Sequence, residues 1–399
     1  MTAPSDRPPA VAVTGLGVVA PCGIGAEAFW GGLHRQPESG DRRAVPDWDP
    51  SPWFKNPKEA RRADPFTQYA LAAAAMALDQ TGDLGADPAR IGVFIGTGIG
   101  GITTNEEQIL IRHEKGDRRV TPFLVPMMMP NAAAAAVSMR HGFEGPCETT
   151  VTACAAGTHS IGNAARLITS GRCDVVLAGG SESAMTPTSM AGFGNMTALS
   201  KSGVSMPFDQ RRDGFIMGEG AGVLVLEELD RAVARGAEIL GLILGSASTA
   251  DAHHITAPAP GGVGAVRCME LAIADAGLSA SDIVHVNAHG TSTPLNDAAE
   301  AEALAKVFGA PGPIVTSTKG VTGHALGAAG ALEAVAVALS MQHHMIPPTL
   351  GLEQFDPELP PIDVVVGEAR SWEPGPTLSN SFGFGGHNGS IVIAPAPRS

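Results

Sequence analysis

Short apolar runs alternate along the chain with longer alanine-rich segments, and this alternation predicts an α/β protein. The apolar runs are rich in Val, Ile and Leu, which is typical of strands covered on both faces. The expected strands span Val11–Gly17, Ile91–Gly96, Asp174–Gly180, Gly222–Glu228, Ile283–Ala288 and Ile314–Ser317. Helical spacing of apolar residues predicts helices over Gln68–Gln80, Cys154–Ser170, Gly264–Ala276 and His324–Met341.

The order of these elements is similar in the two halves of the chain. In each half, an Ile/Val run is followed by a glycine-rich or polar turn and an alanine-rich helix. A chain of 399 residues also exceeds the usual size of one domain. We therefore expect two similar halves, over residues 1–240 and 241–399, with a boundary near Asp230–Gly241.

Composition and charge restrict the class of protein. Hydrophobic residues make up 44% of the chain and charged residues 17%, which indicates a soluble globular protein. The net charge of −14 argues against nonspecific binding to nucleic acid or to an acidic membrane surface. The first nine residues, MTAPSDRPP, lack the cationic start and apolar run of a signal peptide, and no stretch approaches the roughly 18 apolar residues of a membrane span. A cytoplasmic protein is expected.

The cysteines suggest neither a disulfide framework nor a metal site. They are odd in number and never arranged as CxxC, the spacing typical of zinc ligands. Their positions are Cys22, Cys147, Cys154, Cys173 and Cys268.

The segment VTACAAGTHSIG contains the cysteine with the most suggestive setting. Helical spacing after Cys154 puts this residue at or near the first turn of a helix. There the helix macrodipole favours negative charge, which would lower the pKa of the thiol and raise the thiolate fraction. The flanking alanines leave room for a substrate. A buried structural cysteine is the alternative, and for a lone cysteine it is the commoner case.

Two further segments bring histidine and lysine to the ends of strands. NAHGTSTPLND has His289 directly after a strand, while TSTKGVTGHALGAAG has Lys319 after another strand and His324 at the start of a small-residue helix. Each histidine alone fits a hydrogen-bonded structural role equally well. Catalytic groups nevertheless collect on loops at strand ends, so three such junctions bearing Cys, His and Lys with His predict a catalytic site.

Two glycine-rich segments have different implications. NSFGFGGHNGS follows a β-prone stretch, and its backbone could approach a ligand closely and present N–H groups to a developing oxyanion, or simply form a tight turn. GTGIGG, residues 96–101, lacks the GxGxxG spacing and the acidic residue of a dinucleotide site.

Together these segments resemble the β-ketoacyl-acyl-carrier-protein synthases, the decarboxylating condensing enzymes of fatty-acid and type II polyketide synthesis. The resemblance extends from VAVTGLGVVAPCG to NSFGFGGHNGS and includes PFDQRRDGFIMGEGAGVLVLEE and ADAHHITAPAP. It implies a thiolase-like α/β fold of two similar βαβ-rich halves in five alternating layers. It also implies a homodimer, or a heterodimer with a chain-length-factor subunit that resembles a ketosynthase.

The residues also separate the branches of this superfamily. Thiolases use a second cysteine as base in a CxG setting, which this chain lacks near its C-terminus. The branch similar to chalcone synthase has asparagine where His324 stands here, and chain-length factors lack the nucleophile that Cys154 would supply. The resemblance is therefore to the elongating Cys-His-His branch.

That branch implies a decarboxylative Claisen condensation. An acyl group on Cys154 would react with malonyl-acyl carrier protein, giving 3-oxoacyl-acyl carrier protein and carbon dioxide. Both substrates would arrive on the phosphopantetheine arm of the carrier, and no metal or redox cofactor would be required. Fatty-acid and polyketide elongation use the same catalytic residues, so both pathways stay open.

The resemblance assigns roles to the remaining site residues. His289 and His324 would donate hydrogen bonds to the enolate, and the backbone N–H groups of Cys154 and Phe384 would hold the tetrahedral oxyanion. Lys319 would orient the site electrostatically together with Glu300. The substrate-binding set comprises Thr291 and Thr293 on the phosphopantetheine arm, Phe382, and Thr104 in the acyl tunnel, with Phe384 gating entry of the second substrate.

Two surface features complete the resemblance. Met127, Met128 and Met129 would lie close to the dimer contact, the alternative being ordinary core methionines. Lys58, Arg61 and Arg62, which match a basic segment of the family, would dock the acidic carrier, the alternative being a solvated helix face.

Two other classes of function remain as alternatives. A cysteine hydrolase would use Cys154 and one histidine, but it leaves the second histidine and Lys319 without roles. A noncatalytic partner subunit would not need the intact set of residues.

Overall fold

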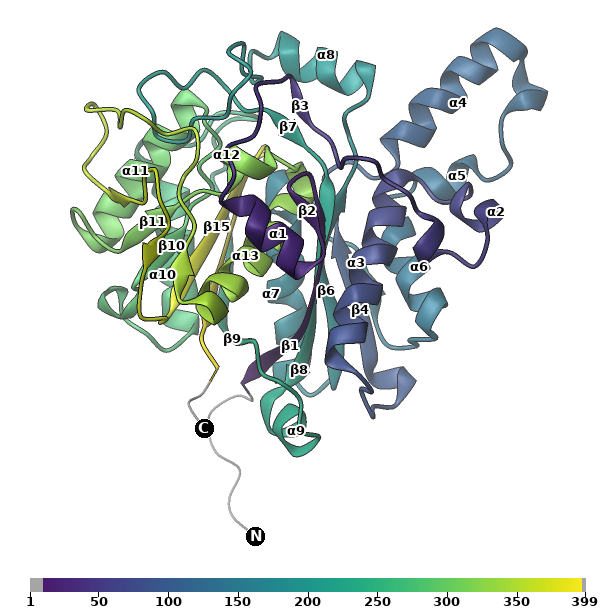
Figure 1. The fold of residues 1–399 in the computed structure, drawn as a ribbon, viewed down its shortest axis with the longest axis horizontal. Helices are drawn as coiled ribbons and strands as arrows, with labels where there is room; N and C mark the ends of the chain where they lie inside the picture. The colour runs from purple at the N-terminus through teal and green to yellow at the C-terminus, as the bar shows by residue number, and fades with distance from the viewer. Residues whose placement is uncertain (1–9, 397–399) are drawn as a thin grey trace.

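The strands pair in the same order in both halves of the chain (Figure 1). The computed structural model describes residues 10–396, so the stretch considered above as a leader lies outside the described residues. The first half has neighbours in the order β5 (Cys147–Glu148), β4 (Ile91–Gly96), β6 (Val175–Glu182), β8 (Gly220–Glu228) and β1 (Val11–Ala20). The second half has β11 (Ile314–Thr316), β10 (His285–Asn287), β15 (Thr377–Gly383), β16 (His387–Ala394) and β9 (Gly241–Ala250).

The directions of the strands repeat as well. In each half the two pairs nearest the joint are antiparallel, β1 with β8 and β8 with β6, and then β9 with β16 and β16 with β15. The outer pairs are parallel. The two halves join where β1 pairs with β9 over Val11–Val13, and β13 (Asp363–Val364) extends the second half beside β11. The domain limits at residues 240 and 241 stay a prediction.

Helices form three layers around these two sets of strands (Figure 1). The outer layers contain α3 (Pro65–Thr81) and α6 (Ala132–His141) on one side, and α10 (Val263–Asp275) and α11 (Pro294–Phe308) on the other. The central layer contains α7 (Ala156–Thr169) and α13 (Ala329–His343), and α13 is buried from Ala329 to Met341. A helix that is apolar all round must be enclosed, which explains this central position. The expected thiolase-like fold in five alternating layers is confirmed.

One expected helix boundary is wrong. The segment His324–Met341 does not form a continuous helix: α12 (Lys319–Thr322) ends before His324, a 3₁₀ turn spans Leu326–Ala328, and α13 begins only at Ala329. Leu326 has a φ of 45°, a left-handed conformation that interrupts a right-handed helix. His324 therefore lies in a short irregular segment between two helices.

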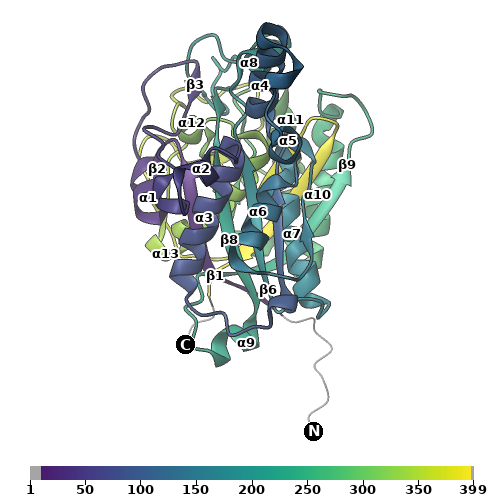
Figure 2. The ribbon, with the colours of Figure 1, turned by 90° about the vertical axis from the view of Figure 1, so that its right-hand side faces the viewer.

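The smaller elements lie around the layers; α4, α8, β3 and β7 are at the end where the parallel strands terminate, whereas α9 is at the opposite end (Figure 1). Figure 2 views the molecule from the α3 and α6 side, with α4 and α8 above the strands. These elements are α1 (Ala26–Leu33), β2 (Gly23–Ile24), β3 (Arg42–Arg43), α2 (Pro57–Ala60), α4 (Ile102–Lys115), α5 (Leu124–Met128), α8 (Pro187–Asn195), β7 (Met217–Gly218), α9 (Leu229–Ala234), β12 (Met345–Ile346) and β14 (Arg370–Ser371). Within residues 10–396, no helix has the length and apolarity needed to cross a membrane.

Candidate active site

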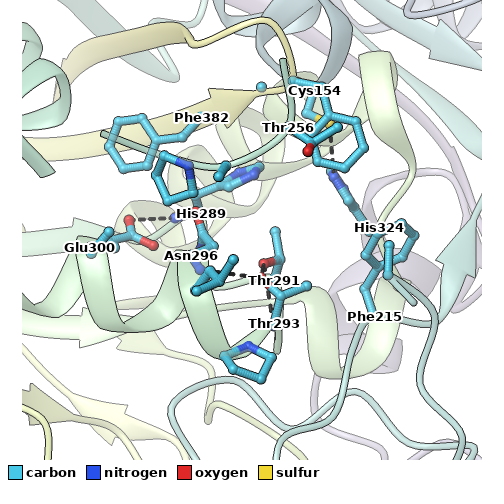
Figure 3. Close-up of a pocket in the computed structure, with 18 of the residues that line it drawn as sticks. Cys154, Phe215, Thr256, His289, Thr291, Thr293, Asn296, Glu300, His324 and Phe382 are labelled. Carbon is cyan, nitrogen blue, oxygen red and sulfur yellow. Dashed lines mark hydrogen bonds between the residues drawn. The ribbon is translucent and has the colours of Figure 1, made fainter. Parts of the chain in front are cut away.

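A cavity of about 500 Å³ opens at the carboxyl ends of the parallel strands and gathers residues from both halves (Figure 3). Cys154 comes from the first half, whereas His289 and His324 come from the second. The predicted residues Thr291, Thr293, Glu300, Phe382 and Phe384 also line this cavity. The structure thus brings together residues separated by up to 230 positions in the sequence.

Cys154 lies in a tight turn directly before α7. The 3₁₀ turn Ala153–Ala155 leads into the helix, and Ala153 has a φ of 49°, an uncommon conformation for a residue with a side chain. The strand β15 passes close by: a Cβ on Gly383 would lie 3.0 Å from the Cys154 nitrogen. Glycine at this position therefore allows β15 to approach the backbone of the nucleophile.

The Cys154 thiol contacts His324 and is enclosed by protein. Cys154 Sγ lies 3.0 Å from His324 Nε2. Burial raises the pKa of Cys154 to about 12, although the charge of Lys319 and the backbone N–H of Phe384 act in the opposite direction. Burial and the charge of Lys319 hold the pKa of His324 well below its usual range. The expectation of a thiol pKa lowered at the helix N-terminus is therefore wrong, because desolvation outweighs the dipole and the resting pair is neutral.

Lys319 determines which nitrogen of His289 carries the proton. Lys319 Nζ lies 3.4 Å from His289 Nδ1, donates to His289 O over 2.5 Å and forms an ion pair with Glu333. An ammonium group has no acceptor, so Nδ1 accepts and the proton of the ring is on Nε2. Burial and the charges of Lys319 and His324 keep the pKa of His289 well below its usual range. His289 is therefore neutral with an Nε2–H donor.

The expectation that Lys319 orients the site together with Glu300 is wrong, because the two side chains do not form an ion pair. The carboxylate that binds Lys319 belongs to Glu333, on α13. Glu300, on α11, instead accepts the backbone N–H groups of His289 and Gly290 over 2.8 and 2.7 Å. Its length and burial suit it to hold the end of β10, so Glu300 fixes the backbone that carries His289.

Aromatic rings and hydroxyl groups complete the wall of the cavity (Figure 3). The ring of His289 lies edge-on to His324, with centroids 5.3 Å apart, and its other neighbour is Phe382 at 5.9 Å. Thr291 and Thr293 hydrogen-bond each other over 2.9 Å between their hydroxyl oxygens. Polar groups thus lie on the approach to the sulfur, while aromatic rings surround the reacting atoms.

Other predicted residues lie outside this cavity. Thr104 is buried on α4, where its N–H donates to Asp64, and it is not among the residues that line the cavity. In the single chain Met128 and Met129 are exposed and Met127 is half-buried, so none of the three is a core methionine. The basic residues Lys58, Arg61 and Arg62 are exposed in and after α2.

Two carboxylates near the site were missed by the sequence analysis. Glu333 is the only charged residue in α13, and a lone acid in an apolar helix is a signal of a buried ionic partner. Glu182 accepts from Gly98 N, Ile99 N and Gly327 N over 2.6 to 3.3 Å. Two amide groups of the GTGIGG loop, those of Gly98 and Ile99, therefore bind a carboxylate of the protein itself.

Comparisons with known proteins agree with this geometry. A model of the "Beta-ketoacyl synthase, N-terminal domain" matches residues 38–232, and one of the "Beta-ketoacyl synthase, C-terminal domain" matches residues 240–353. The chain is 44% identical to a 3-oxoacyl-[acyl-carrier-protein] synthase 2 from Synechocystis sp., over 96% of this chain and 97% of that protein.

Solved structures give the same answer for the fold. The ishigamide ketosynthase/chain length factor structure has a TM-score of 0.91 at 32% identity, covering 98% of this chain and 100% of that chain. A type II polyketide ketosynthase solved in complex with its acyl-carrier protein has a TM-score of 0.88 at 32% identity, with the same coverage.

The fold and the buried Cys-His-His site define a condensing enzyme of the thiolase-like class. The chain belongs to the β-ketoacyl synthase family. It is a ketosynthase, an acyltransferase that catalyses the condensation of fatty-acid or polyketide chain elongation.

Proposed function

We propose that Cys154 carries the acyl group and that His289 and His324 stabilise the enolate of the second substrate. The observation that carries this proposal is the contact of 3.0 Å between Cys154 Sγ and His324 Nε2, with the edge of His289 facing the same space. Cys154 is thus a nucleophile in contact with a base, His324, and His289 is a second hydrogen-bond donor beside them. A two-stage acyl transfer needs these three groups.

In the first stage, the proton of the Cys154 thiol moves to His324 Nε2. The sulfur attacks the thioester carbon of the acyl-carrier, a C–S bond forms, and the bond to the phosphopantetheine sulfur breaks. His324 returns the proton to the departing thiol. Because the resting pair is neutral, the proton transfer accompanies the attack.

In the second stage, the malonyl thioester lies with its carbonyl oxygen between the two histidines. The bond to the carboxylate breaks, carbon dioxide leaves, and its electron pair forms an enolate. The enolate accepts a hydrogen bond from Nε2–H of His289 and a second one from His324, whose neutral ring takes the Nε2–H tautomer once Cys154 is acylated and no longer needs a base. The enolate carbon then attacks the acyl carbon on Cys154. The backbone N–H groups of Cys154 and Phe384 hold the oxyanion until the Cys154 sulfur departs as a thiolate, which takes a proton from water to restore the resting thiol. The Phe384 N–H already donates to this sulfur in the resting site.

Thr291 and Thr293 would bind the phosphopantetheine arm, and Phe382 and Phe384 would contact the substrate. Every step uses the residues of this chain and the arm of the carrier, so we propose that no metal or redox cofactor takes part. Two expectations remain predictions from the sequence: that Thr104 lines an acyl tunnel, and that the protein is cytoplasmic.

A Cys154→Gln variant separates condensation from simple thioester hydrolysis. The amide of glutamine imitates an acylated cysteine, so the variant should release carbon dioxide from malonyl-carrier without forming a new carbon–carbon bond. A hydrolase would release none. Adding His289→Ala to this variant should abolish the release, and carbon dioxide formation that persists would contradict the role given to His289.

We also propose that the carrier docks on α2 and the neighbouring end of α4. The Arg62 guanidinium lies 4.2 Å from the centre of the Phe123 ring, which brings α2 beside the segment after α4. The exposed cations there are Lys58, Arg61, Arg62, Lys115, Arg118 and Arg119. In a chain with a net charge of −14, such a group offers an acidic carrier a favourable local field.

Charge reversal tests this surface. Arg61→Glu with Arg62→Glu should slow acylation by acyl-carrier, most strongly at low salt, and leave acylation by a small pantetheine thioester unchanged. Arg172→Glu, an exposed arginine before the start of β6, is the matched control. Equal slowing with both donors would indicate damage to the site, and no slowing with the carrier would exclude this surface.

We further propose that the chain forms a homodimer through the face that includes the edge strand β5. Exposed apolar residues concentrate over this part of the chain: Ile109, Leu110, Val125, Met128, Met129, Met139 and Val151. Among the described strands, β5 pairs only with β4, so its other edge is open. An apolar face beside an open strand edge favours pairing with a second chain.

The mass of the purified chain in solution tests the dimer. A homodimer has twice the 40.6 kDa of one chain. Val125→Glu should weaken it, whereas Val233→Glu, exposed on α9, should not. A monomer that dimerises only with a different ketosynthase-like chain would establish the heterodimer instead.

A further inference from the structure

A third buried histidine, His159, connects the turn that carries Cys154 to the strand that follows Phe384. Its side chain is only 7% exposed and comes from the beginning of α7. Ring atom Nδ1 lies 2.8 Å from Thr152 Oγ1, and Nε2 lies 3.0 Å from Asn388 O. The two-stage reaction gives this histidine no role, although it belongs to the same segment, VTACAAGTHSIG, as the nucleophile.

The partners of His159 determine where its proton is. Asn388 O is a carbonyl oxygen and can only accept, so Nε2 carries the proton and donates to it. Burial lowers the pKa of His159, which favours the neutral ring. Nδ1 of the neutral ring then accepts from the Thr152 hydroxyl group. The ring is therefore held at both of its nitrogens.

The ring of His159 also packs directly on the backbone of β16. A Cβ on Gly389, the residue after Asn388, would lie 2.9 Å from both Cδ2 and Nε2 of this ring. A larger residue at this position would displace the ring, so glycine allows the close approach. Packing and hydrogen bonds thus fix His159 in one position.

The bond from Thr152 holds the turn of the nucleophile. Thr152 directly precedes the 3₁₀ turn Ala153–Ala155, and its carbonyl oxygen accepts the N–H of Ala155 over 3.1 Å. The φ of 49° at Ala153 is a conformation that persists only where the surrounding structure holds it. The bond between Thr152 and His159 therefore helps to fix the direction of the Cys154 N–H.

The bond to Asn388 holds the second donor of the oxyanion site. Asn388 pairs with Phe382 near the end of the hairpin formed by β15 and β16, and Phe384 lies in the turn of this hairpin. The position of the Phe384 N–H therefore depends on the first residues of β16. His159 joins these residues to the turn of Cys154.

We propose that His159 is a positioning residue that sets the spacing between the backbone N–H groups of Cys154 and Phe384. The inference rests on the proposed function, in which these two groups hold the tetrahedral oxyanion. Preorganised donors stabilise an oxyanion only where they point at the position that it will occupy, so a shift of one donor should slow the steps that form this intermediate. Decarboxylation of malonyl-carrier does not use these two groups and should not change.

Substitutions of Thr152 test the connection. Thr152→Val keeps the shape of the side chain but removes the donor, whereas Thr152→Ser keeps the donor. The thioester is the one that acylates the wild type fastest in a series from acetyl- to dodecanoyl-pantetheine. Mass spectrometry should show acylation of Cys154 slowed about 10- to 100-fold in Thr152→Val and close to the wild-type rate in Thr152→Ser. Thr169→Val, which loses a hydroxyl bonded to a backbone oxygen at the end of α7, is the matched control.

A double variant shows whether the hydroxyl acts through the ring. His159→Phe should also slow acylation, and Thr152→Val should have no further effect in that background. A second readout separates positioning from general damage. When Thr152→Val is combined with Cys154→Gln, carbon dioxide release from malonyl-carrier should stay within about twofold of that of Cys154→Gln alone.

The inference is overturned if Thr152→Val is acylated at the wild-type rate, or if Thr152→Ser is as slow as Thr152→Val. It is also overturned if Thr152→Val lowers carbon dioxide release as much as acylation, or keeps its full effect in His159→Phe. Absence of carbon dioxide release from Cys154→Gln alone would contradict the proposed function instead, and the acylation rates would still decide the role of His159.

Discussion

Cys154 and His324 touch at the wall of the cavity, and burial sets the charge of both residues. Desolvation raises the pKa of the Cys154 thiol to about 12 and lowers that of His324, so both groups are neutral at pH 7. The helix N-terminus next to Cys154 is then available to stabilise charge that develops during the reaction rather than a thiolate at rest. Catalysis therefore depends on proton transfer between these two side chains.

The pH dependence of Cys154 alkylation tests this neutral pair. With a pKa raised to about 12, the thiolate fraction grows about tenfold per pH unit between pH 6 and 9, and the rate of reaction with iodoacetamide should rise in proportion. The rate can be followed by mass spectrometry of the Cys154 peptide. A plateau above pH 7 would instead indicate a thiolate formed at rest.

Lys319 and Glu333 form a buried pair whose two contributions can be separated. Their side chains are 1% and 2% exposed, so Lys319→Met alone leaves a carboxyl group in the core and should cost about 3–5 kcal/mol of stability. Lys319→Met with Glu333→Leu should recover most of that loss. The rate of malonyl-carrier decarboxylation should stay about 10²–10³-fold below wild type in the single and the double variant, because both lack the Lys319 ammonium group that keeps the His289 proton on Nε2.

Urea unfolding and carbon dioxide release measure the two effects. If the double variant recovered activity together with stability, Lys319 would be structural only. Glu300→Gln tests the role of Glu300 in holding the β10 backbone. That role would be supported if the variant lowered stability as Lys319→Met does and left the protonation state of His289 unchanged.

At the scale of elements, the central helices bring the reactive residues together through close contact. A Cβ on Gly330 of α13 would lie 2.0 Å from Thr158 Oγ1 of α7, so no side chain fits between the helices there. Gly192 of α8 has nothing within 4 Å of the same position. The first glycine is required by packing and the second is not.

The matched variants Gly330→Ala and Gly192→Ala test this contact. Gly330→Ala should destabilise the chain by about 1–3 kcal/mol through overpacking and slow the acylation of Cys154, which precedes α7. Gly192→Ala should be neutral or stabilising by up to about 1 kcal/mol, because alanine favours a helix. Similar urea unfolding and acylation rates in both variants would contradict the packing of α7 against α13.

Much of the fold could be predicted because its strands are continuous apolar runs. β4 matches its expected bounds at both ends, whereas β9, β15 and β16 were not assigned because their sequences mix small and polar residues with the apolar ones. The interruption before α13 depends on the left-handed Leu326, which has no signal in an Ala- and Gly-rich segment.

For the site, the sequence was sufficient to select the residues but not their pairing. The motifs identified Cys154, His289, His324 and Lys319, and the structure brings all four together. The choice of Glu333 over Glu300 as the partner of Lys319 depends on how α13 lies against α12, a tertiary contact that local pattern does not contain. Desolvation of Cys154 is likewise a property of the assembled cavity.

At the scale of the whole molecule, the two halves contribute equivalent turns to one cavity. A 3₁₀ turn precedes each central helix, and each turn contains a residue with a left-handed φ, Ala153 at 49° and Leu326 at 45°. The first turn carries Cys154 and the second follows His324. The repeated topology therefore explains how the nucleophile and its base meet although they are 170 residues apart.

Buried histidines make the stability of the whole chain depend on pH. Burial lowers the pKa of His285 to about 3, and neither of its ring nitrogens has a hydrogen-bond partner among the described residues. Between pH 6.5 and 3 the unfolded chain binds the proton that the folded chain excludes, so stability is fully present above pH 6.5 and falls as the pH decreases. The slope is at most ~1.4 kcal/mol per pH unit for one such group.

His285→Leu should flatten that dependence. Leucine keeps an apolar side chain against Trp372, whose ring centroid lies 5.3 Å from that of His285. Urea unfolding at pH 5 and 7.5 should show a smaller difference for the variant than for the wild type. His254→Leu, exposed and outside the core, is the control, and an unchanged difference in His285→Leu would contradict the assignment.

The central claim is that an acyl group on Cys154 is consumed by condensation, and intact-protein mass spectrometry tests it most directly. After incubation with an acyl-carrier, the wild-type chain should gain the mass of one acyl group, located on the Cys154 peptide. Addition of malonyl-carrier should remove this mass and give 3-oxoacyl-carrier with release of carbon dioxide, while Cys154→Ala should show neither step. An acyl group on another cysteine, or its loss as a free acid without a longer carrier-bound product, would contradict the account.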